Sequence, residues 1–205
     1  MSDESQNAER PSVEIYTDGG CEPNPGPGGY GVVLVHPQTN KRKQASGGFR
    51  LTTNNRMEIF AAIAGLEMLK QPCQVTLYSD SRYLVDAMTQ GWVESWKRKQ
   101  WWHSKTERVP NRDPWERLGG LCEKHQVEFR WVRGHAGHAE NELCDQLAMA
   151  ALRQPNLPAD AGHENKPEQD VRPDLREGDP CRKCSTPVIK QTGGKKRNRD
   201  YYYEY

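Results

Sequence analysis

Long apolar segments are missing from this 205-residue chain. No run approaches the roughly 20 apolar residues that span a bilayer, and the start of the chain lacks the basic-then-apolar layout of a secretory signal. Apolar residues make up only 34% of the chain, and the mean hydropathy is −0.99. We therefore expect a cytoplasmic protein, part of which does not pack into a core.

An excess of one charge is also missing. The 29 Lys+Arg residues balance 28 Asp+Glu residues and leave a net charge of +1, so composition gives no hint of a nucleic-acid partner. The chain has six cysteines, an even number, but without secretion the default expectation is reduced thiols. Four of them (Cys21, Cys73, Cys122 and Cys144) are widely spaced, and we expect free thiols there.

The low apolar content comes mainly from the last quarter of the chain. Residues 153–205 contain only five Leu, Ile, Val or Phe in 53 residues, which is typical of disorder. Prolines at 155, 158, 167 and 173 interrupt any helix there. The sequence therefore predicts a catalytic-sized domain at 11–153, a flexible linker at 154–178 and a small incomplete module at 179–205.

Periodic patterns within 11–153 predict an α/β domain. Strands are expected at 13–17, 30–36, 46–51, 75–79 and 127–132. Helices are expected from a cap at Thr53 or Asn54 onward, and at 81–89, 92–98, 114–125 and 141–153. This order predicts a mixed five-stranded sheet flanked by helices, with a poorly structured C-terminal extension.

Four acidic residues occupy comparable places in this pattern. Asp18 and Asp80 directly follow apolar strands, whereas Glu58 and Asp145 lie about one turn into helices. Clustered carboxylates repel one another unless a cation neutralises them, and oxygen ligands of this kind suit Mg²⁺ or Mn²⁺. The residues alone also allow the alternative that all four are helix caps and surface acids.

Five sequence blocks occur in the order and at the spacing of the bacterial-type (type 1) ribonuclease H family, which residues 11–153 resemble. The blocks are Thr17-Asp18-Gly19, NPGPGGYG at 24–31, TTNNRME at 52–58, Ser79-Asp80-Ser81, and WVRGHAGH at 131–138 running on to ENELCD at 140–145. Each block alone is weak, but together they are a strong signature. The resemblance implies a ribonuclease H-like fold.

The resemblance also implies an activity. The family cleaves the RNA strand of RNA·DNA hybrids with two metal ions, leaving 5′-phosphate and 3′-hydroxyl ends, and we expect a monomeric enzyme of this kind. It implies that Asp18 bridges two Mg²⁺ ions, for which Mn²⁺ can substitute, and that Glu58 binds on the leaving-group side and contacts a ribose 2′-OH. Asp80 then holds metal and the attacking water, and Asp145 binds the metal on the nucleophile side.

His135 lies in the Gly134-His135-Ala136-Gly137-His138 segment. From the residue alone, a solvated loop histidine is the favoured interpretation. The resemblance implies a mobile proton carrier that orients water or assists product release, because imidazole titrates near neutral pH. His138 lacks that support and is interpreted as a structural or surface residue.

Residues on three segments resemble the family's substrate contacts. Asn24, in a Gly-rich stretch, is a candidate for contacting the ribose 2′-hydroxyls that distinguish RNA from DNA. Thr53, Asn54 and Asn55 resemble contacts to the DNA strand, for which hydroxyl, amide and helix N-terminal N–H groups are suited. Arg82 stands where many relatives have Gln, and we expect it near the substrate.

Basic residues alternate with tryptophans at 91–102. This pattern resembles the family's basic protrusion, which cradles the DNA strand, although a solvated helix with a buried Trp face is the simpler alternative. The residues assigned to the protrusion are Trp96, Lys97, Arg98, Lys99, Trp101 and Trp102. We expect Trp92, Trp115 and Trp131 to pack in the core.

The end of the chain contains Cys181-x-x-Cys184, which resembles one half of a zinc ribbon. A tetrahedral site needs four ligands, usually from a second Cys-x-x-Cys, and none follows. We therefore predict no stable zinc in this chain alone. We also expect that deleting 155–205 leaves catalysis intact.

Three other functions remain open from the sequence. The first is a non-catalytic hybrid-binding module, the second a DNA-strand nuclease or strand-transfer enzyme of the same superfamily, and the third a regulatory protein acting through Cys181 and Cys184. The four carboxylates disfavour the first, and the Asn24 segment with the basic protrusion disfavours the second.

Overall fold

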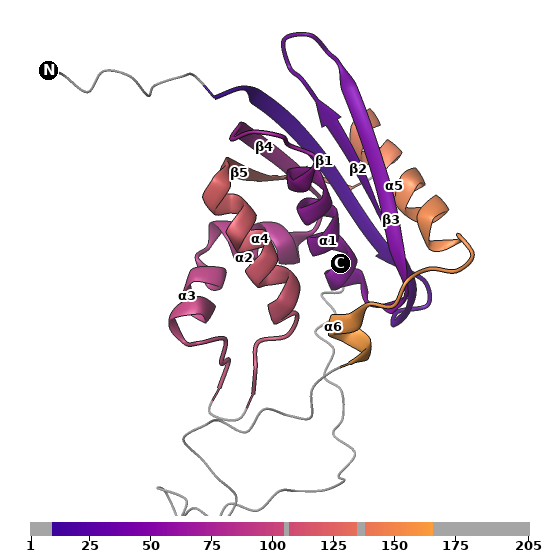
Figure 1. The fold of residues 1–205 in the computed structure, drawn as a ribbon, viewed down its shortest axis with the longest axis vertical. Helices are drawn as coiled ribbons and strands as arrows, with labels where there is room; N and C mark the ends of the chain where they lie inside the picture. Colours follow the sequence, from indigo (N-terminus) through magenta and orange to yellow (C-terminus); the bar gives the residue numbers. More distant parts are fainter. Residues whose placement is uncertain (1–9, 105–106, 135–137, 166–205) are drawn as a thin grey trace, which may run out of the picture. The chain divides into compact units, whose positions relative to one another are not determined.

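The computed structural model describes residues 10–104, 107–134 and 138–165, which all belong to one compact unit. Its centre is a five-stranded sheet with the order β3-β2-β1-β4-β5 (Figure 1). The strands are β1 (Ser12–Cys21), β2 (Gly26–Val35), β3 (Arg42–Thr52), β4 (Gln74–Ser79) and β5 (Gln126–Trp131). The predicted module at 179–205, with Cys181 and Cys184, lies outside the described residues.

The sheet is mixed, as the sequence predicts. β1, β2 and β3 form an antiparallel meander, whereas β4 pairs in parallel with both β1 and β5. The buried apolar side chains form two clusters, and successive residues of β2 alternate between them. Val32 and Leu34 pack in the larger cluster, and Val33 and Val35 pack in the smaller one. Because successive strand residues point to opposite faces, both faces of the sheet are covered.

Helices supply that cover (Figure 1). Along the chain they are α1 (Asn54–Glu67), α2 (Arg82–Thr89), α3 (Trp92–Arg98), α4 (Arg112–Lys124), α5 (Ala139–Leu152) and α6 (Ala161–Glu164). Helix α5 packs through Leu143, Cys144 and Leu147 in the smaller cluster.

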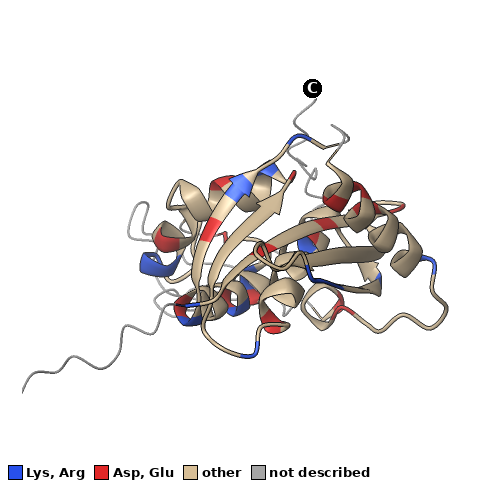
Figure 2. Cartoon of the chain, turned by 90° about the horizontal axis from the view of Figure 1, so that it is seen from above, with Lys and Arg blue, Asp and Glu red and all other residues tan. Residues whose placement is uncertain are grey.

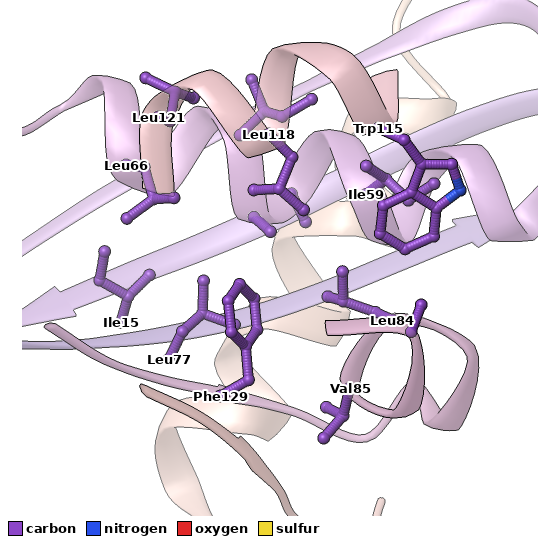
Figure 3. Packing of buried hydrophobic residues seen from close by; sticks show 14 of the residues in the cluster. Ile15, Ile59, Leu66, Leu77, Leu84, Val85, Trp115, Leu118, Leu121 and Phe129 are labelled. Carbon is purple, nitrogen blue, oxygen red and sulfur yellow. The ribbon is translucent and has the colours of Figure 1, made fainter. Parts of the chain in front are cut away.

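Helix α1 covers the other face of the sheet. Ile59 and Leu66 of α1 lie with Ile15 of β1 and Leu77 of β4 in the larger cluster, where they meet Trp115 of α4 (Figure 3). Burying a large apolar side chain contributes about 1.5–3 kcal/mol, so this cluster fixes α1 firmly against the strands.

The strands extend further than the sequence pattern indicates. The sequence pattern ends the first strand at Thr17, but β1 continues to Cys21, paired with Gly28 of β2. Asp18 therefore lies inside a strand, opposite Gly31, and not after its end. Glycines here mark close packing and not a turn, because a Cβ added at Gly19 would clash with α1 and one added at Gly31 would clash with α5.

Residues 154–165 differ from the predicted flexible linker. Backbone N–H of Arg50 in β3 donates to Pro158 O at 2.9 Å, and the short helix α6 follows. Asp160, between them, is only 2% exposed. The ordered domain therefore continues past the predicted boundary at 153, and the remainder of the predicted linker from 166 lies outside the described residues.

Charged residues of both signs occur side by side on the same elements (Figure 2), in keeping with the balanced composition. Within the described part of the chain, every helix is too short or too polar to cross a membrane.

Candidate metal centre and nucleic-acid interface

The parallel pairing of β1 and β4 brings two predicted metal ligands together. Thr17 of β1 lies beside Ser79 of β4 in register, so Asp18 and Asp80 are the next residue on each chain. Asp80 follows the last residue of β4, as predicted, and Asp18 continues along β1. The side-chain hydroxyl of Thr17 donates to Tyr78 O at 3.3 Å and adds a cross-strand contact just before both carboxylates.

Glu58 joins them from α1. One carboxylate oxygen each from Asp18, Glu58 and Asp80 lie within 4.8 Å of one another, and all three residues are half-buried. The close approach of α1 to β1 makes this possible: a Cβ added at Gly19 would come within 2.5 Å of the Glu58 nitrogen. We call these three residues the catalytic carboxylate group, after the role that the sequence predicts for them.

The environment of Glu58 is unfavourable for a negative charge. Burial raises the pKa of its carboxyl well above the usual value, and the neighbouring charges of Asp18 and Asp80 raise it further. Glu58 Oε2 is buried and has no hydrogen-bond partner among the described residues. A divalent cation bound by these oxygens offsets both penalties, so the donor set fits a hard metal ion.

Asp145, the fourth predicted ligand, is half-buried on α5 and is not a member of the catalytic carboxylate group. Burial raises the pKa of the thiol of its neighbour Cys144, and the charges of Asp18 and Asp80 raise it further. Cys144 is therefore near enough to these two carboxylates to feel their charge. Cys144 also donates through Sγ to Tyr16 O of β1 at 3.2 Å. The segment that contains Asp145 is thus held beside β1.

Asn141 is a site residue that the sequence reasoning missed. It is 3% exposed, and its Nδ2 lies 3.5 Å from Asp80 Oδ2, while its Oδ1 is buried without a partner among the described residues. Asn141 precedes Asp145 by four residues, which places the two on the same face of α5. The four-residue spacing from Asp145 is the sequence signal that could have identified Asn141.

The loop between β5 and α5 contains His135, which lies outside the described residues. Gly134, the last described residue before it, lies against the catalytic carboxylate group. A Cβ added there would come within 2.6 Å of Asp80 Oδ2. Backbone N–H of Val132 donates to Ser79 O at 3.0 Å and holds the start of this loop at the end of β4.

Two of the predicted substrate contacts touch each other. The side-chain oxygen of Asn24 accepts from the backbone N–H of Asn54 at 3.3 Å, which joins the hairpin between β1 and β2 to the start of α1. Thr53 is the N-cap of α1 but makes no side-chain cap bond, and Asn54 and Asn55 are exposed. Their polar groups therefore face solvent next to Asn24.

Arg82 begins α2 and is exposed, two residues after Asp80. Its guanidinium carbon lies 3.7 Å from the centroid of the Trp131 ring, a cation–π contact. Trp131 is 38% exposed, which corrects the expectation that it packs in the core. Its indole N–H donates to Asp80 O at 2.9 Å, so the ring is tied to the backbone of Asp80.

The predicted basic protrusion is only partly available to a ligand. Trp101 and Trp102 are each 5% exposed, which differs from the prediction that their rings contact nucleic acid. Gln100 and Trp101 have left-handed φ angles of 52° and 63°, and Trp101 accepts from Val109 N–H at 2.9 Å. This tight turn folds both indoles back onto the protein.

The remaining protrusion residues divide into two kinds. Trp96 is half-buried, with its ring centroid 5.7 Å from that of Trp115, and Lys97 pairs with Glu94 at 3.4 Å and Glu123 at 3.7 Å. Arg98 and Lys99, by contrast, are exposed. These two cations are the part of the protrusion best placed to meet a phosphate.

Comparison with known proteins agrees with this geometry. Residues 10–153 match the RNase H family model. Ribonuclease H of Rippkaea orientalis is 60% identical over 154 residues, covering 75% of this chain and 93% of the relative. Ribonuclease HI of a Synechocystis strain is 54% identical over 147 residues, covering 71% and 91%.

Two solved structures are similar in fold. LC9-RNase H1, a type 1 RNase H with the type 2 active-site motif, has a TM-score of 0.63 at 32% identity and covers 72% of this chain and 74% of its own. LC11-RNase H1 in complex with an RNA/DNA hybrid has a TM-score of 0.54 at 26% identity, covering 68% and 96%.

A mixed sheet with a carboxylate cluster at the junction of β1, β4 and α1 defines a metal-dependent nuclease. Given the family match over 144 of 205 residues, counting 10 to 153, the chain belongs to the ribonuclease H family. It is a ribonuclease H of the bacterial type 1 class, an endoribonuclease whose substrate is the RNA strand of an RNA·DNA hybrid.

Proposed function

We propose that the protein uses two Mg²⁺ ions to hydrolyse the RNA strand, leaving 5′-phosphate and 3′-hydroxyl ends, with Mn²⁺ as a substitute. The observation behind this proposal is the convergence of three carboxylate oxygens within 4.8 Å, together with the buried Glu58 Oε2, which has no partner in the part of the chain that the structure describes. Bound there, two divalent ions supply an activated water and stabilise charge on the leaving 3′-oxygen.

The protein's own residues have separate tasks in this proposal. Asp18, on the central strand β1, would be the ligand shared by the two metal ions. Glu58 would hold the metal ion on the leaving-group side, and Asp80 would hold metal and orient the attacking water. Asp145 completes the set from α5, and Asn141 fixes the Asp80 carboxylate through its amide.

Substrate contacts follow the exposed polar groups around these carboxylates. Asn24 reads ribose 2′-hydroxyls, and Thr53, Asn54 and Asn55 meet the DNA strand together with Arg98 and Lys99. Arg82 approaches the hybrid beside Asp80, with its guanidinium oriented by the Trp131 ring. A planar guanidinium held in this way suits a phosphate or a base edge.

His135 accepts or delivers a proton in the same reaction. The position of Gly134 against Asp80 supports this role. We expect His135→Ala to slow turnover severely and to leave hybrid binding unchanged, as measured by kcat and by hybrid affinity. His138→Ala, in the same segment, is the matched control and keeps kcat. The cytoplasmic location and the monomeric state stay predictions of the sequence.

The test is a cleavage assay on three matched duplexes. The protein is incubated with RNA·DNA, RNA·RNA and DNA·DNA of one sequence, in Mg²⁺, in Mn²⁺ and in EDTA. We expect products only from the RNA strand of RNA·DNA, only with a divalent cation, and with 5′-phosphate ends. Binding of the hybrid without cleavage in any metal would instead indicate a non-catalytic module, and cleavage of DNA·DNA a DNA-strand nuclease.

Salt dependence tests the electrostatic part of the interface. Because bound cations on the protein displace counterions from phosphates, KM for the hybrid should rise steeply with NaCl. Replacing Arg98 and Lys99 together by Gln should flatten that dependence by about two released ions. A KM that is independent of salt would contradict the proposal that the basic protrusion binds the hybrid.

A further inference from the structure

Outside the catalytic carboxylate group, the most densely bonded polar cluster surrounds Arg56 on the first turn of α1. Arg56 Nε and Nη2 donate to the two oxygens of Asp160 at 2.6 Å each. Arg56 Nη1 and Nη2 donate to the two oxygens of Asp113 at 2.7 and 2.6 Å. Thr52 Oγ1 adds a bond to Asp160 at 2.7 Å. We call Thr52, Arg56, Asp113 and Asp160 the Arg56 cluster.

This cluster is buried where it meets the C-terminal segment. The Arg56 and Asp160 side chains are each 2% exposed, and Asp113 is half-exposed. Helix α6 lies tightly on the pair, because a Cβ added at Gly162 would come within 2.7 Å of Arg56 Nη2. Bidentate arginine–carboxylate pairs are geometrically specific as well as strong, so the cluster fixes the relative positions of its members.

The members come from four separate places in the chain. Thr52 ends β3, Arg56 lies on the first turn of α1, Asp113 starts α4 after the protrusion, and Asp160 precedes α6. Thr52 and Arg56 flank the proposed DNA-strand contacts at Thr53, Asn54 and Asn55. Arg56 is also two residues before Glu58. The cluster thus holds the turn that presents the substrate contacts, and it ties that turn to the base of the protrusion.

We propose that Asp160 is a positioning residue of the enzyme: through Arg56 and Thr52 it holds the first turn of α1 in the orientation that presents Asn54 and Asn55 to the DNA strand. The inference rests on the proposed contacts of these two asparagines. It also revises the expectation that all of 155–205 is dispensable, because Asp160 in this range bonds to Thr52 of β3 and Arg56 of α1.

Two truncations of the full chain separate this role from that of the remaining tail. A protein ending at Asn165 keeps the whole Arg56 cluster, and we expect kcat and KM like those of the full chain. A protein ending at Leu157 lacks Asp160 and α6. We expect its KM for the hybrid to rise about tenfold with kcat changed less than about threefold, since losing contacts made equally in the ground and transition states raises KM and leaves kcat.

Point variants test Asp160 itself. Asp160→Ala should raise KM as much as the shorter truncation does. Asp160→Asn keeps the side-chain volume and should also raise KM, so it replaces Asp160→Ala in the test if that variant does not fold. Glu164→Gln is the matched control on the same segment, because it removes the exposed pair with Arg50 and leaves the Arg56 cluster intact. Its KM should equal that of the wild type.

A purely stabilising role predicts a different result. Val35→Ala, a core change at the far end of β2, supplies a protein with a lowered Tm and an unaltered Arg56 cluster. All variants are assayed well below their Tm. If Asp160→Ala and Asp160→Asn lower Tm but leave KM unchanged, as Val35→Ala should, the positioning role is refuted.

Asn55→Ala in the same assay distinguishes failure of the positioning role of Asp160 from failure of the proposed DNA-strand contacts of Asn54 and Asn55. A raised KM for Asn55→Ala with an unchanged KM for Asp160→Ala refutes positioning alone. An unchanged KM for both Asn55→Ala and Asn54→Ala refutes the DNA-strand contacts, and positioning with them. If both proposals hold, Asp160→Ala combined with Asn55→Ala raises KM by less than the product of the single effects.

Discussion

Arg56 and Glu58, two residues apart on α1, each belong to a cluster of carboxylates, and the two clusters are neutralised differently. Around Arg56, two aspartates accept four short bonds from one guanidinium supplied by the chain. Around Glu58, three carboxylates converge; burial and the charges of Asp18 and Asp80 raise the pKa of Glu58, and its Oε2 finds no partner among the described residues. The first cluster is completed by the chain, and the second needs a cation from outside.

This difference shows how a fold can hold a repulsive site in place. Gathering carboxylates costs free energy that other contacts must offset. The Arg56 cluster lies next to the repulsive one on the same helix turn, and the apolar face of α1 packs into the core through Ile59 and Leu66. Structural and catalytic acids are therefore distinguished by the partner that they find, and not by residue type.

The largest effect should come from breaking the catalytic carboxylate group. Asp80→Asn keeps the side-chain shape but removes the charge that binds metal and orients water. We expect kcat to fall about a thousandfold or more, because the ligands act as a unit. Steady-state cleavage of an RNA·DNA hybrid in Mg²⁺ measures it. Glu142→Gln, an exposed acid on α5, is the control that should keep full activity, and an active Asp80→Asn protein would refute the metal assignment.

The Arg56 cluster should instead respond in stability. Arg56→Met keeps an apolar stem but leaves Asp160 buried without its cation, for which we expect a loss of about 3 kcal/mol in the free energy of unfolding. Urea denaturation in EDTA measures this loss. Arg112→Met on α4 removes only an exposed pair with Glu116 and should cost about 0.5 kcal/mol or less. Equal losses in both variants would contradict the contrast between the two clusters.

Removing repulsion within the catalytic carboxylate group should raise the stability of the metal-free protein. Glu58→Gln deletes one of three converging charges, so the metal-free protein should gain about 1 kcal/mol of stability while losing activity. Mg²⁺ should raise the Tm of the wild type, since a ligand of the folded state stabilises it, and should raise that of Glu58→Gln much less. Thermal unfolding with Mg²⁺ and with EDTA tests both statements. A metal-free Glu58→Gln protein less stable than the wild type would show that repulsion is not the dominant force there.

Much of the metal site was predictable from the sequence, because its signals are local. Asp80 directly follows a short apolar strand, and Glu58 lies on a helix whose apolar spacing is regular. Parallel pairing then brings Asp18 and Asp80 together at neighbouring positions. The family blocks added the roles of these residues, which spacing alone does not contain.

The Arg56 cluster was not predictable, because its signals are long-range. Asp160 is 104 residues from Arg56 and lies in a segment whose composition reads as disordered. One buried ion pair can order such a segment without any apolar pattern. The burial of Trp101 and Trp102 was not predictable for a related reason: a turn with positive φ angles, at residues other than glycine, returns their rings to the protein.

The smallest effect concerns the pH dependence of the Arg56 cluster. Hydrogen bonds from Arg56 and Thr52 outweigh burial and lower the pKa of Asp160 in the folded protein. A carboxyl whose folded pKa is lowered contributes stability that is fully present above its unfolded value, near 3.9, and is lost as the pH falls through the folded pKa. The difference in unfolding free energy between the wild type and Asp160→Asn should therefore be constant above about pH 5 and shrink as the solution is acidified below about pH 4.

Urea denaturation over this range, in EDTA so that the catalytic carboxylate group binds no metal, measures the difference. Thr52→Val should reduce the pH dependence in part, because it removes one bond to Asp160 and keeps the guanidinium. A difference that grows on acidification would mean that Asp160 is held protonated, and the contrast with the catalytic carboxylate group would then be lost.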